Sequence, residues 1–175
     1  MKIQKTKFKD LFVIQSERFL DNRGYFRELL LEKSIKKKLN FFVVSKSKKN
    51  VARGLHFQLQ NPQGKYVSVI KGQIFDVAVD CRPKSKTFGK HFKILLDEKN
   101  CKSIYIPPGF AHGFLGMKKE NIVVYGCDNY RHKNSEAGIM WNDPKLKIKW
   151  PTKRPILSKK DKQNKNFDFY FNKDE

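Results

Sequence analysis

Two basic side chains that could carry out proton chemistry lie close together in residues 51–71, VARGLHFQLQNPQGKYVSVIK. His56 and Lys65 stand on two short apolar runs that are joined by the turn-forming segment NPQG. Because side chains on a strand alternate between its faces, both residues can face one cavity if the two runs share a sheet. A base beside a fixed cation suits the removal of a proton next to a carbonyl, since the cation stabilises the enolate oxygen. The alternative is that both are surface residues of a hairpin.

The rest of the chain offers partners for such acid–base chemistry. His112, Tyr125 and Tyr130 are further side chains that can carry a proton. A buried carboxylate that holds an imidazole fixes its tautomer and raises its basicity. Four carboxylates could do this for His56, and their spacing along the chain does not distinguish among them: Asp80, Asp128, Asp143 and Asp161.

Other catalytic chemistries find little support in the sequence. Metal-binding barrels of the jelly-roll kind present a His-x-His pair with a carboxylate and a later histidine, whereas His56 and His112 each stand alone. The G-x-S-x-G motif of serine hydrolases and the Gly-rich dinucleotide fingerprint are absent. No cysteine lies in a context that would activate it as a nucleophile. We therefore expect neither a metal ion nor a cofactor.

The composition is that of a folded protein without a membrane-spanning segment. The 175 residues are 39% hydrophobic and 13% aromatic, which is enough for one sizeable core, so we expect a single domain over residues 1–175. No run approaches the ~18 uncharged apolar residues that span a bilayer, and the first residues lack the apolar stretch of a signal peptide. Three widely spaced cysteines form no redox pattern. These features predict a cytoplasmic protein with reduced thiols and no membrane partner.

The formal net charge of +21 raises nucleic-acid binding as an alternative function. The charge comes mostly from lysine and is spread over the chain, whereas nucleic-acid binders concentrate charge in a patch with exposed aromatic residues. A positive field also attracts an anionic small molecule and raises its rate of encounter. We therefore expect an anionic substrate as the partner, and no nucleic acid.

The pattern of apolar residues predicts an all-β sandwich or barrel, because many short apolar runs follow one another at a spacing of roughly 8–12 residues. Only residues 31–39, LEKSIKKKL, have the amphipathic pattern of a helix. A C-terminal tail rich in Phe and Tyr, around residues 167–171, is expected to pack on the barrel or on a partner subunit. The runs interpreted as strands include residues 8–15, 41–44, 73–81, 91–96, 103–106 and 122–125.

Seven segments occur in the order, and at close to the spacing, that one enzyme family shows. They are RGLHFQ at 53–58, PQGK at 62–65, IFDVAVDCR at 74–82, TFG at 87–89, IPPGFAHGF at 106–114, AGIMWNDP at 137–144 and LSKKD at 157–161. Each segment is a weak signal alone, but the ordered set is specific. On these residues the chain resembles the dTDP-4-dehydrorhamnose 3,5-epimerase family, from about residue 8 to residue 161.

The resemblance implies a cupin-type jelly-roll barrel with a short helix in the N-terminal region and a C-terminal tail. It implies a homodimer that binds no metal and inverts C3 and C5 of a nucleotide-diphosphate sugar, a dTDP-4-keto-6-deoxyhexose. His56 would remove the protons next to the C4 keto group, with Asp161 as its partner. Lys65 would face the enolate oxygen, and Tyr130 would return a proton from the opposite face.

The resemblance also implies a set of substrate contacts. The two diphosphate ligands would be Arg23 and Arg53. His112 would lie in the same pocket as the catalytic residues. The nucleotide contacts would be Phe19, Phe26 and Glu28.

Two segments depart from the family pattern. Phe41 and Val43 stand where the family has amide side chains that line the nucleotide or sugar side of the pocket. Residues 131–133, Arg-His-Lys, replace an aromatic residue and a proline after Tyr130. We therefore predict an altered substrate-facing rim around an intact catalytic set. Three alternatives stay open: a related sugar or nucleotide, inversion at C3 or C5 only, and a non-catalytic barrel that binds nucleotide sugars.

Overall fold

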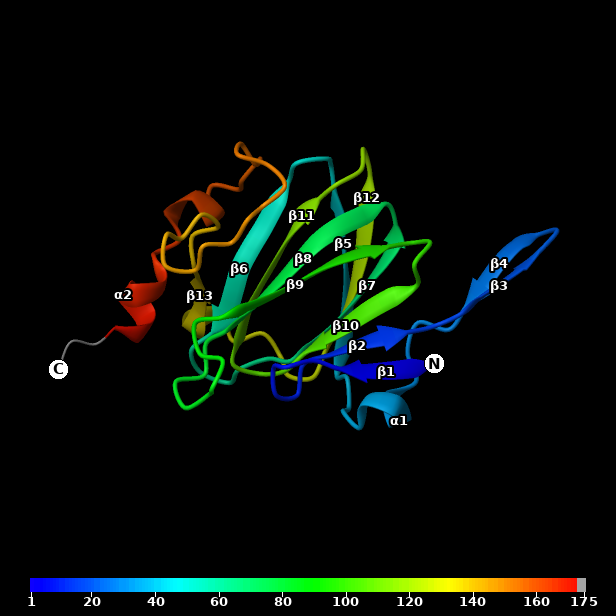
Figure 1. Ribbon diagram of the computed structural model, residues 1–175, viewed down its shortest axis with the longest axis horizontal. Helices are drawn as coiled ribbons and strands as arrows, with labels where there is room; N and C mark the ends of the chain where they lie inside the picture. Colours follow the sequence, from blue (N-terminus) through cyan, green and yellow to red (C-terminus); the bar gives the residue numbers. More distant parts are fainter. Residues whose placement is uncertain (173–175) are drawn as a thin grey trace.

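The chain folds into two facing β-sheets and a separate hairpin, as the computed structural model in Figure 1 shows for residues 1–172. This confirms the predicted all-β class, and the last three residues of the expected domain lie outside the described ones. The helices α1 (Glu32–Ile35) and α2 (Phe167–Phe171) are short. The strands are β1 (Lys2–Lys5), β2 (Phe12–Gln15), β3 (Arg18–Asp21), β4 (Gly24–Arg27), β5 (Phe41–Ser47), β6 (Ala52–Gln58), β7 (Lys65–Lys71), β8 (Gln73–Asp80), β9 (His91–Asp97), β10 (Lys102–Ile106), β11 (Phe110–Gly116), β12 (Asn121–Cys127) and β13 (Glu136–Gly138).

The two sheets pack face to face around a common apolar core. One has six strands in the order β1-β2-β10-β7-β12-β5, and the other has five in the order β13-β6-β11-β8-β9. Val67 and Val123 from the first sheet meet Phe110 and Phe114 from the second, and all four side chains are buried. Alternating apolar side chains on antiparallel strands produce this shared core. Two antiparallel sheets closed around a core form the predicted jelly-roll barrel.

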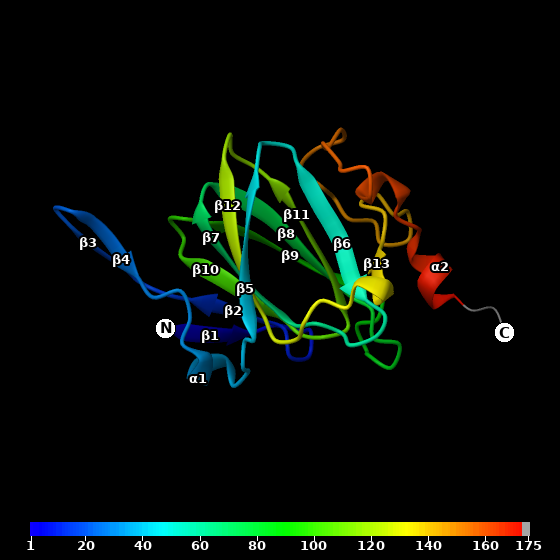
Figure 2. The ribbon, with the colours of Figure 1, turned by 180° about the vertical axis from the view of Figure 1, so that it is seen from behind.

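Strand β11 is buried along its whole length, although an antiparallel strand often has one solvated face. The cause is the segment after β13, which folds back over the outer face of the five-stranded sheet (Figure 2). There the ring centroid of Phe167 lies 5.3 Å from that of Phe88 and 4.7 Å from that of Phe171. The ring of Phe57 on β6 packs against Phe171. The predicted aromatic tail therefore packs on its own barrel. The same covering segment carries Asp161 to β6.

The predicted helix over residues 31–39 is shorter in the structure. Helix α1 ends where Lys36 adopts a left-handed conformation with φ of 53°. The side chain of Glu32 then accepts a hydrogen bond from the backbone N–H of Leu39 at 2.9 Å, which closes the following loop. The apolar spacing of Ile35 and Leu39, which predicted a longer helix, instead reflects the burial of both side chains against the outer face of the six-stranded sheet. No helix in residues 1–172 is long and apolar enough to cross a membrane.

Residues 8–15 also differ from the single strand that was predicted. Only Phe12–Gln15 is a strand, and it pairs with β1. The connection turns at Asp10, whose φ is 65°, while the backbone N–H of Leu11 donates to the carbonyl of Phe8 at 3.2 Å. Phe8 is buried in the core between the sheets. Its apolar character therefore reflects core packing and not strand pairing.

Strands β3 and β4 form a hairpin that projects from the body of the molecule (Figures 1 and 2). Its turn runs through Asp21 and Gly24, and Gly24 takes a φ of 133° that favours glycine. Phe19 and Phe26 face each other in register, yet they are 57% and 65% exposed. Large apolar side chains that stay exposed on a protruding hairpin are typical of a contact surface.

Candidate active site

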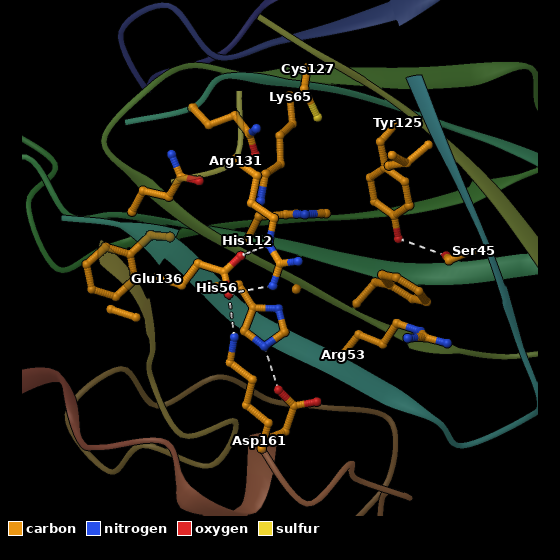
Figure 3. Close-up of a pocket in the computed structure, with 18 of the residues that line it drawn as sticks. Ser45, Arg53, His56, Lys65, His112, Tyr125, Cys127, Arg131, Glu136 and Asp161 are labelled. Atoms are coloured by element: carbon orange, nitrogen blue, oxygen red, sulfur yellow. Dashed lines mark hydrogen bonds and ion pairs between the residues drawn. The ribbon is translucent and has the colours of Figure 1, made fainter. Parts of the chain in front are cut away.

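A cavity of about 630 Å³ opens between the two sheets (Figure 3). Strands β6 and β11 of one sheet and β5, β7 and β12 of the other form its walls. Residues on either side of the 3-10 helix η1 (Lys133–Ser135), and residues before and at the start of the 3-10 helix η2 (Asp161–Gln163), also line it. The side chains with polar atoms that line it include Ser45, Arg53, His56, Gln58, Gln63, Lys65, His112, Tyr125, Arg131, Glu136, Ser158, Lys160 and Asp161.

An irregularity between β6 and β11 lets two functional side chains face this cavity. Arg53 and His56 are three residues apart, a spacing that places side chains of a regular strand on opposite faces. The register shifts between the pairs His112–His56 and Phe114–Arg53, so three steps on β6 match two on β11. Gly54 lies within the shift, and a Cβ atom there would stand 2.5 Å from the carbonyl oxygen of His112. The glycine of the RGLHFQ segment thus permits the close strand contact that turns both residues inward.

His56 and Asp161 form a hydrogen-bonded pair at the edge of the cavity. The Nε2 atom of His56 lies 2.5 Å from Oδ1 of Asp161, and their side chains are 38% and 5% exposed. Ser158 donates to the other carboxylate oxygen at 2.9 Å and accepts from the backbone N–H of Asp161 at 3.0 Å. Burial by itself raises the pKa of Asp161, but the hydrogen bonds from His56 and Ser158 outweigh it and hold this pKa below its ordinary value. An ionised carboxylate therefore orients the imidazole.

Lys65 brings a cation to the same cavity from β7 of the opposite sheet (Figure 3). Burial lowers the pKa of its ammonium group, and the charges of Cys127, Glu136 and Asp76 oppose that effect. Within residues 1–172 no carboxylate lies within the 4.0 Å that defines an ion pair with Lys65. A desolvated cation without such a partner is suited to a negative charge that develops during a reaction.

His112 is the neighbour of His56 across the β6–β11 pair, but it has a different partner. Its Nε2 atom lies 2.8 Å from Oδ2 of Asp76, and both side chains are buried. Because this pair is anchored inside the sheet, His112 forms a fixed wall beside His56. Among residues 1–172 no group of three His, Cys, Asp or Glu side chains could hold a metal ion.

Tyr125 faces the cavity from β12, opposite the sheet that carries His56 (Figure 3). Its hydroxyl and that of Ser45 on β5 share a hydrogen bond of 3.1 Å. Burial raises the pKa of Tyr125 well above its ordinary value, with a smaller opposing effect from the Ser45 hydrogen bond. The phenol is therefore protonated at neutral pH.

A charged cluster of three residues lines the end of the cavity near Asp161. Glu136 pairs with Arg131 and, at 2.7 Å, with Lys160. The hydrogen bond from Arg131 is the main reason that the pKa of Glu136 falls to about 2. Sequence reasoning did not single out Glu136 or Lys160, because neither belongs to a recognisable catalytic pattern. For Lys160, its position beside Asp161 in LSKKD was the one available signal.

The structure does not bring Tyr130 into the cavity. Its ring is 65% exposed and stacks on Phe41, with ring centroids 5.6 Å apart and an angle of 6° between the planes. Phe41 and Val43 do line the cavity, in agreement with the prediction that the departures from the family pattern lie on its rim. The adjacent Arg131 also lines it, whereas Tyr130 does not. The assignment of Tyr130 as the acid stays a prediction that this arrangement does not support.

The predicted diphosphate and nucleotide contacts split into two groups. Arg53 lines the cavity, where its guanidinium donates to Ser47 Oγ at 2.9 Å. Arg23, Phe19 and Phe26 lie on the protruding hairpin and line no part of the cavity of their own chain. Arg23 instead pairs with Asp21 at 2.6 Å and is 85% exposed. Glu28, just after β4, is exposed and also lies outside the cavity.

Comparisons with known proteins point to the family that the sequence motifs suggested. The model of the dTDP-4-dehydrorhamnose 3,5-epimerase family matches residues 5–168. The relative of that name from Shigella flexneri is 40% identical over 174 residues, covering 95% of this chain and 96% of that protein. The one from Methanothermobacter thermautotrophicus is 41% identical over 166 residues, covering 90% of each.

A solved structure gives the same result. The dTDP-6-deoxy-D-glucose-3,5-epimerase from Legionella pneumophila, in complex with dTDP-4-keto-L-rhamnose, superposes with a TM-score of 0.91. It is 38% identical, and the match covers 95% of this chain and 93% of that one. The extent of these matches, together with the cavity that holds His56, Asp161 and Lys65, shows that the chain belongs to the dTDP-4-dehydrorhamnose 3,5-epimerase family of isomerases.

Proposed function

We propose that this protein inverts C3 and C5 of dTDP-4-dehydro-6-deoxyglucose and so forms dTDP-4-dehydro-L-rhamnose. The observation that carries the proposal is that the carboxylate-bound imidazole of His56 and the ammonium of Lys65 line one cavity between the sheets. The cavity volume of about 630 Å³ is in the usual range for small-molecule sites. The Legionella relative, solved with dTDP-4-keto-L-rhamnose, supports this substrate class.

His56 is the base in this proposal. The protons at C3 and C5 are acidic because both carbons flank the C4 keto group. Asp161 holds Nε2 of His56, which leaves the other ring nitrogen free to take a proton from the sugar. The ionised Asp161 then stabilises the imidazolium that forms. A positioned base of this kind typically contributes about 10²–10⁴-fold to the rate.

Lys65 stabilises the enolate. Removal of either proton places negative charge on the same oxygen at C4, so one cation serves both inversions. The Lys65 ammonium lies in the facing sheet and is desolvated, which makes its interaction with that oxygen stronger than in water. Loss of one such donor typically costs about 10²–10³ in turnover.

The protein acts as a homodimer in this proposal, with each hairpin completing the site of the other subunit. Arg53 lines the cavity, whereas Arg23 is carried away from it on the hairpin that exposes Phe19 and Phe26. A second copy would bury these rings and bring Arg23 to the diphosphate, since an arginine binds phosphate oxygens in bidentate fashion. Glu28 follows the same hairpin.

The homodimer proposal is tested by mixing inactive subunits. An Arg23→Ala subunit and a His56→Ala subunit are unfolded together, refolded and assayed. If the hairpin reaches the partner's cavity, each mixed dimer has one intact site, and about a quarter of the wild-type activity returns by random pairing. No recovery, or a monomer in analytical ultracentrifugation, contradicts the shared site.

We also propose that the protein works in the cytoplasm. Its three cysteines are free and buried, which fits a reducing compartment.

The reaction itself is tested by proton NMR of the substrate in heavy water. Deuterium at C3 and C5, with formation of the inverted sugar, supports the proposal. Exchange at one centre only identifies a single-centre epimerase. Binding without any exchange identifies a non-catalytic barrel and rules the proposal out.

A further inference from the structure

We propose that Arg27 fixes the projecting hairpin in the orientation that delivers it to the partner's cavity, which makes Arg27 a positioning residue for substrate binding. This inference rests on the proposed homodimer, in which each hairpin completes the site of the other subunit. Arg27 is the last residue of β4, at the base of the hairpin (Figure 1). Strands β3 and β4 form a two-stranded sheet of their own, so contacts at this base determine where the tip points.

All three nitrogen atoms of the half-buried Arg27 guanidinium donate hydrogen bonds to the body of the molecule. Nε donates to the hydroxyl of Ser16 at 2.8 Å, Nη1 to the carbonyl of Val69 at 3.3 Å, and Nη2 to the hydroxyl of Ser103 at 3.3 Å. The Ser103 hydroxyl donates in turn to that of Ser68 at 2.9 Å, and both serines are fully buried neighbours in the β10–β7 register. Buried hydroxyl groups need such partners, so the guanidinium and this patch of the six-stranded sheet match each other.

The charge of Arg27 is not balanced by a nearby carboxylate. Within residues 1–172 no acidic group lies within the 4.0 Å that defines an ion pair with it. A guanidinium bound to neutral oxygens gains less Coulombic energy than an ion pair does, but its rigid planar fork of donors fixes direction. The hydroxyl of Tyr66 adds a contact on the other side of the base, because it donates to the carbonyl of Leu29 just after β4. The hairpin is therefore held where it leaves the sheet and where it returns.

The hydrogen bonds of Arg27 also decide which face of the hairpin turns outward. Side chains alternate along a strand, so Arg27 and its neighbour Phe26 point to opposite faces. Because Arg27 turns toward its own sheet, Phe26 and its register partner Phe19 turn away from that sheet, and both rings are exposed. These two rings are the predicted nucleotide contacts. The orientation that Arg27 sets therefore presents them to the second subunit.

Arg18 offers a comparison within the same hairpin. It lies directly opposite Arg27 in the β3–β4 register, and its guanidinium lies over the ring of Tyr25, 5.0 Å from the centroid. Tyr25 belongs to the hairpin itself. Loss of Arg18 thus removes the same charge from the same part of the chain but leaves the bonds from Arg27 to the sheet in place.

The first test measures kcat and KM for the dTDP-sugar substrate in Arg27→Met, Arg27→Lys and Arg18→Met. We expect Arg27→Met to raise KM about tenfold, because a hairpin that is no longer preorganised must be ordered as the substrate binds, while kcat stays within about threefold of the wild type. Arg27→Lys should give an intermediate KM, since lysine keeps the charge but not the planar fork of donors. Arg18→Met should keep the wild-type KM. An unchanged KM in Arg27→Met, or an equal rise in Arg18→Met, overturns the inference.

The second test separates an effect of Arg27 on the partner's cavity from an effect on its own fold. Arg27→Met subunits are unfolded with an equal amount of His56→Ala subunits and refolded, and Arg27→Lys takes their place if the methionine variant folds poorly. In each mixed dimer the intact cavity belongs to the Arg27 variant and receives the unaltered hairpin of its partner. Random pairing then gives about a quarter of all sites the wild-type KM. An effect confined to each chain's own cavity gives no such sites and overturns the inference.

Failure of the proposed function has a different signature. A wild-type protein that is monomeric in analytical ultracentrifugation refutes the shared site, and the inference falls with it. A dimer in which Arg27→Met keeps the wild-type KM refutes the inference alone.

Discussion

Replacement of Asp161 by asparagine tests the core of the proposed mechanism. The carboxylate is 5% exposed, accepts from Ser158 and lies 2.5 Å from Nε2 of His56. Asparagine keeps the shape of the side chain but removes the charge that orients the ring and stabilises the imidazolium. An NH₂ group facing Nε2 also forces the tautomer in which Nε2 has no proton, so the catalytic nitrogen is protonated and cannot act as the base.

The expected size of this effect follows from the geometry. Loss of the aspartate of a comparable buried triad costs about 10⁴ in kcat, and loss of a positioned base costs about 10²–10⁴. The imidazole of His56 is 38% exposed, so water partly replaces the lost carboxylate and the lower part of this range applies. We therefore expect kcat to fall by about 10²–10³, which corresponds to about 3–4 kcal/mol at 1.36 kcal/mol per factor of ten.

The assay follows deuterium uptake at C3 and C5 at saturating substrate. Ser158→Ala is the matched control, because it removes one hydrogen bond to Asp161 but leaves the charge and the contact with His56. We expect this control to lose no more than about tenfold, in line with about 1 kcal/mol for one hydrogen bond. If Asp161→Asn keeps a rate within threefold of the wild type while it folds normally, the carboxylate does not support the base and the proposed mechanism is wrong.

Three further predictions concern the cation, the charged cluster and the covering segment. Lys65→Met should lower the rate of exchange by about 10²–10³ with little change in substrate binding, and a separate measurement of kcat and KM checks this. The folded-state pKa of Glu136 is depressed from 4.5 to about 2, so its ion pairs add stability above pH 4.5 that is lost as the pH falls toward 2. Because Arg131 and Lys160 are largely exposed, Glu136→Gln should lower the free energy of unfolding by only about 1 kcal/mol at pH 7 and by almost nothing near pH 2. Urea unfolding at the two pH values measures this difference, and an equal loss of unfolding free energy at both contradicts the ion pairs. Phe167→Ala should lower the unfolding free energy by about 3–5 kcal/mol, and a change below about 1 kcal/mol in urea titrations would mean that the segment is not part of the core.

Four aspartates were possible partners of His56 on sequence grounds, and each has different contacts in the structure. In the structure, Asp80 is held by Arg82, and Asp128 accepts from Gly64 and Tyr105. Asp143 accepts the backbone N–H groups of residues 145, 146 and 167. Only Asp161 reaches His56, from a position 105 residues away in the chain. Spacing cannot reveal such a contact, because it depends on how the C-terminal segment folds over the sheet.

Local patterns predicted other features well. The short apolar runs from residue 73 onward correctly identified β8, β9 and β10, because the β-forming residues of each run are a local property of the chain, although β8 and β10 are buried on both faces. The amphipathic residues 31–39 led to an overlong helix, since Leu39 is buried by the sheet and not by a helical turn. Tyr130 was assigned as the acid from the family resemblance, yet its ring stacks on Phe41 outside the cavity.

By itself, the sequence determined the β-class of the fold, the family and the residue types available for proton transfer. These depend on side-chain alternation and on ordered motifs, which are local properties of the chain. The tertiary structure alone decided which carboxylate meets His56, which tyrosine lines the same cavity and that Arg23 lies outside the cavity of its own chain. Those contacts join strands of opposite sheets or distant segments, and their geometry exists only after the two sheets have packed.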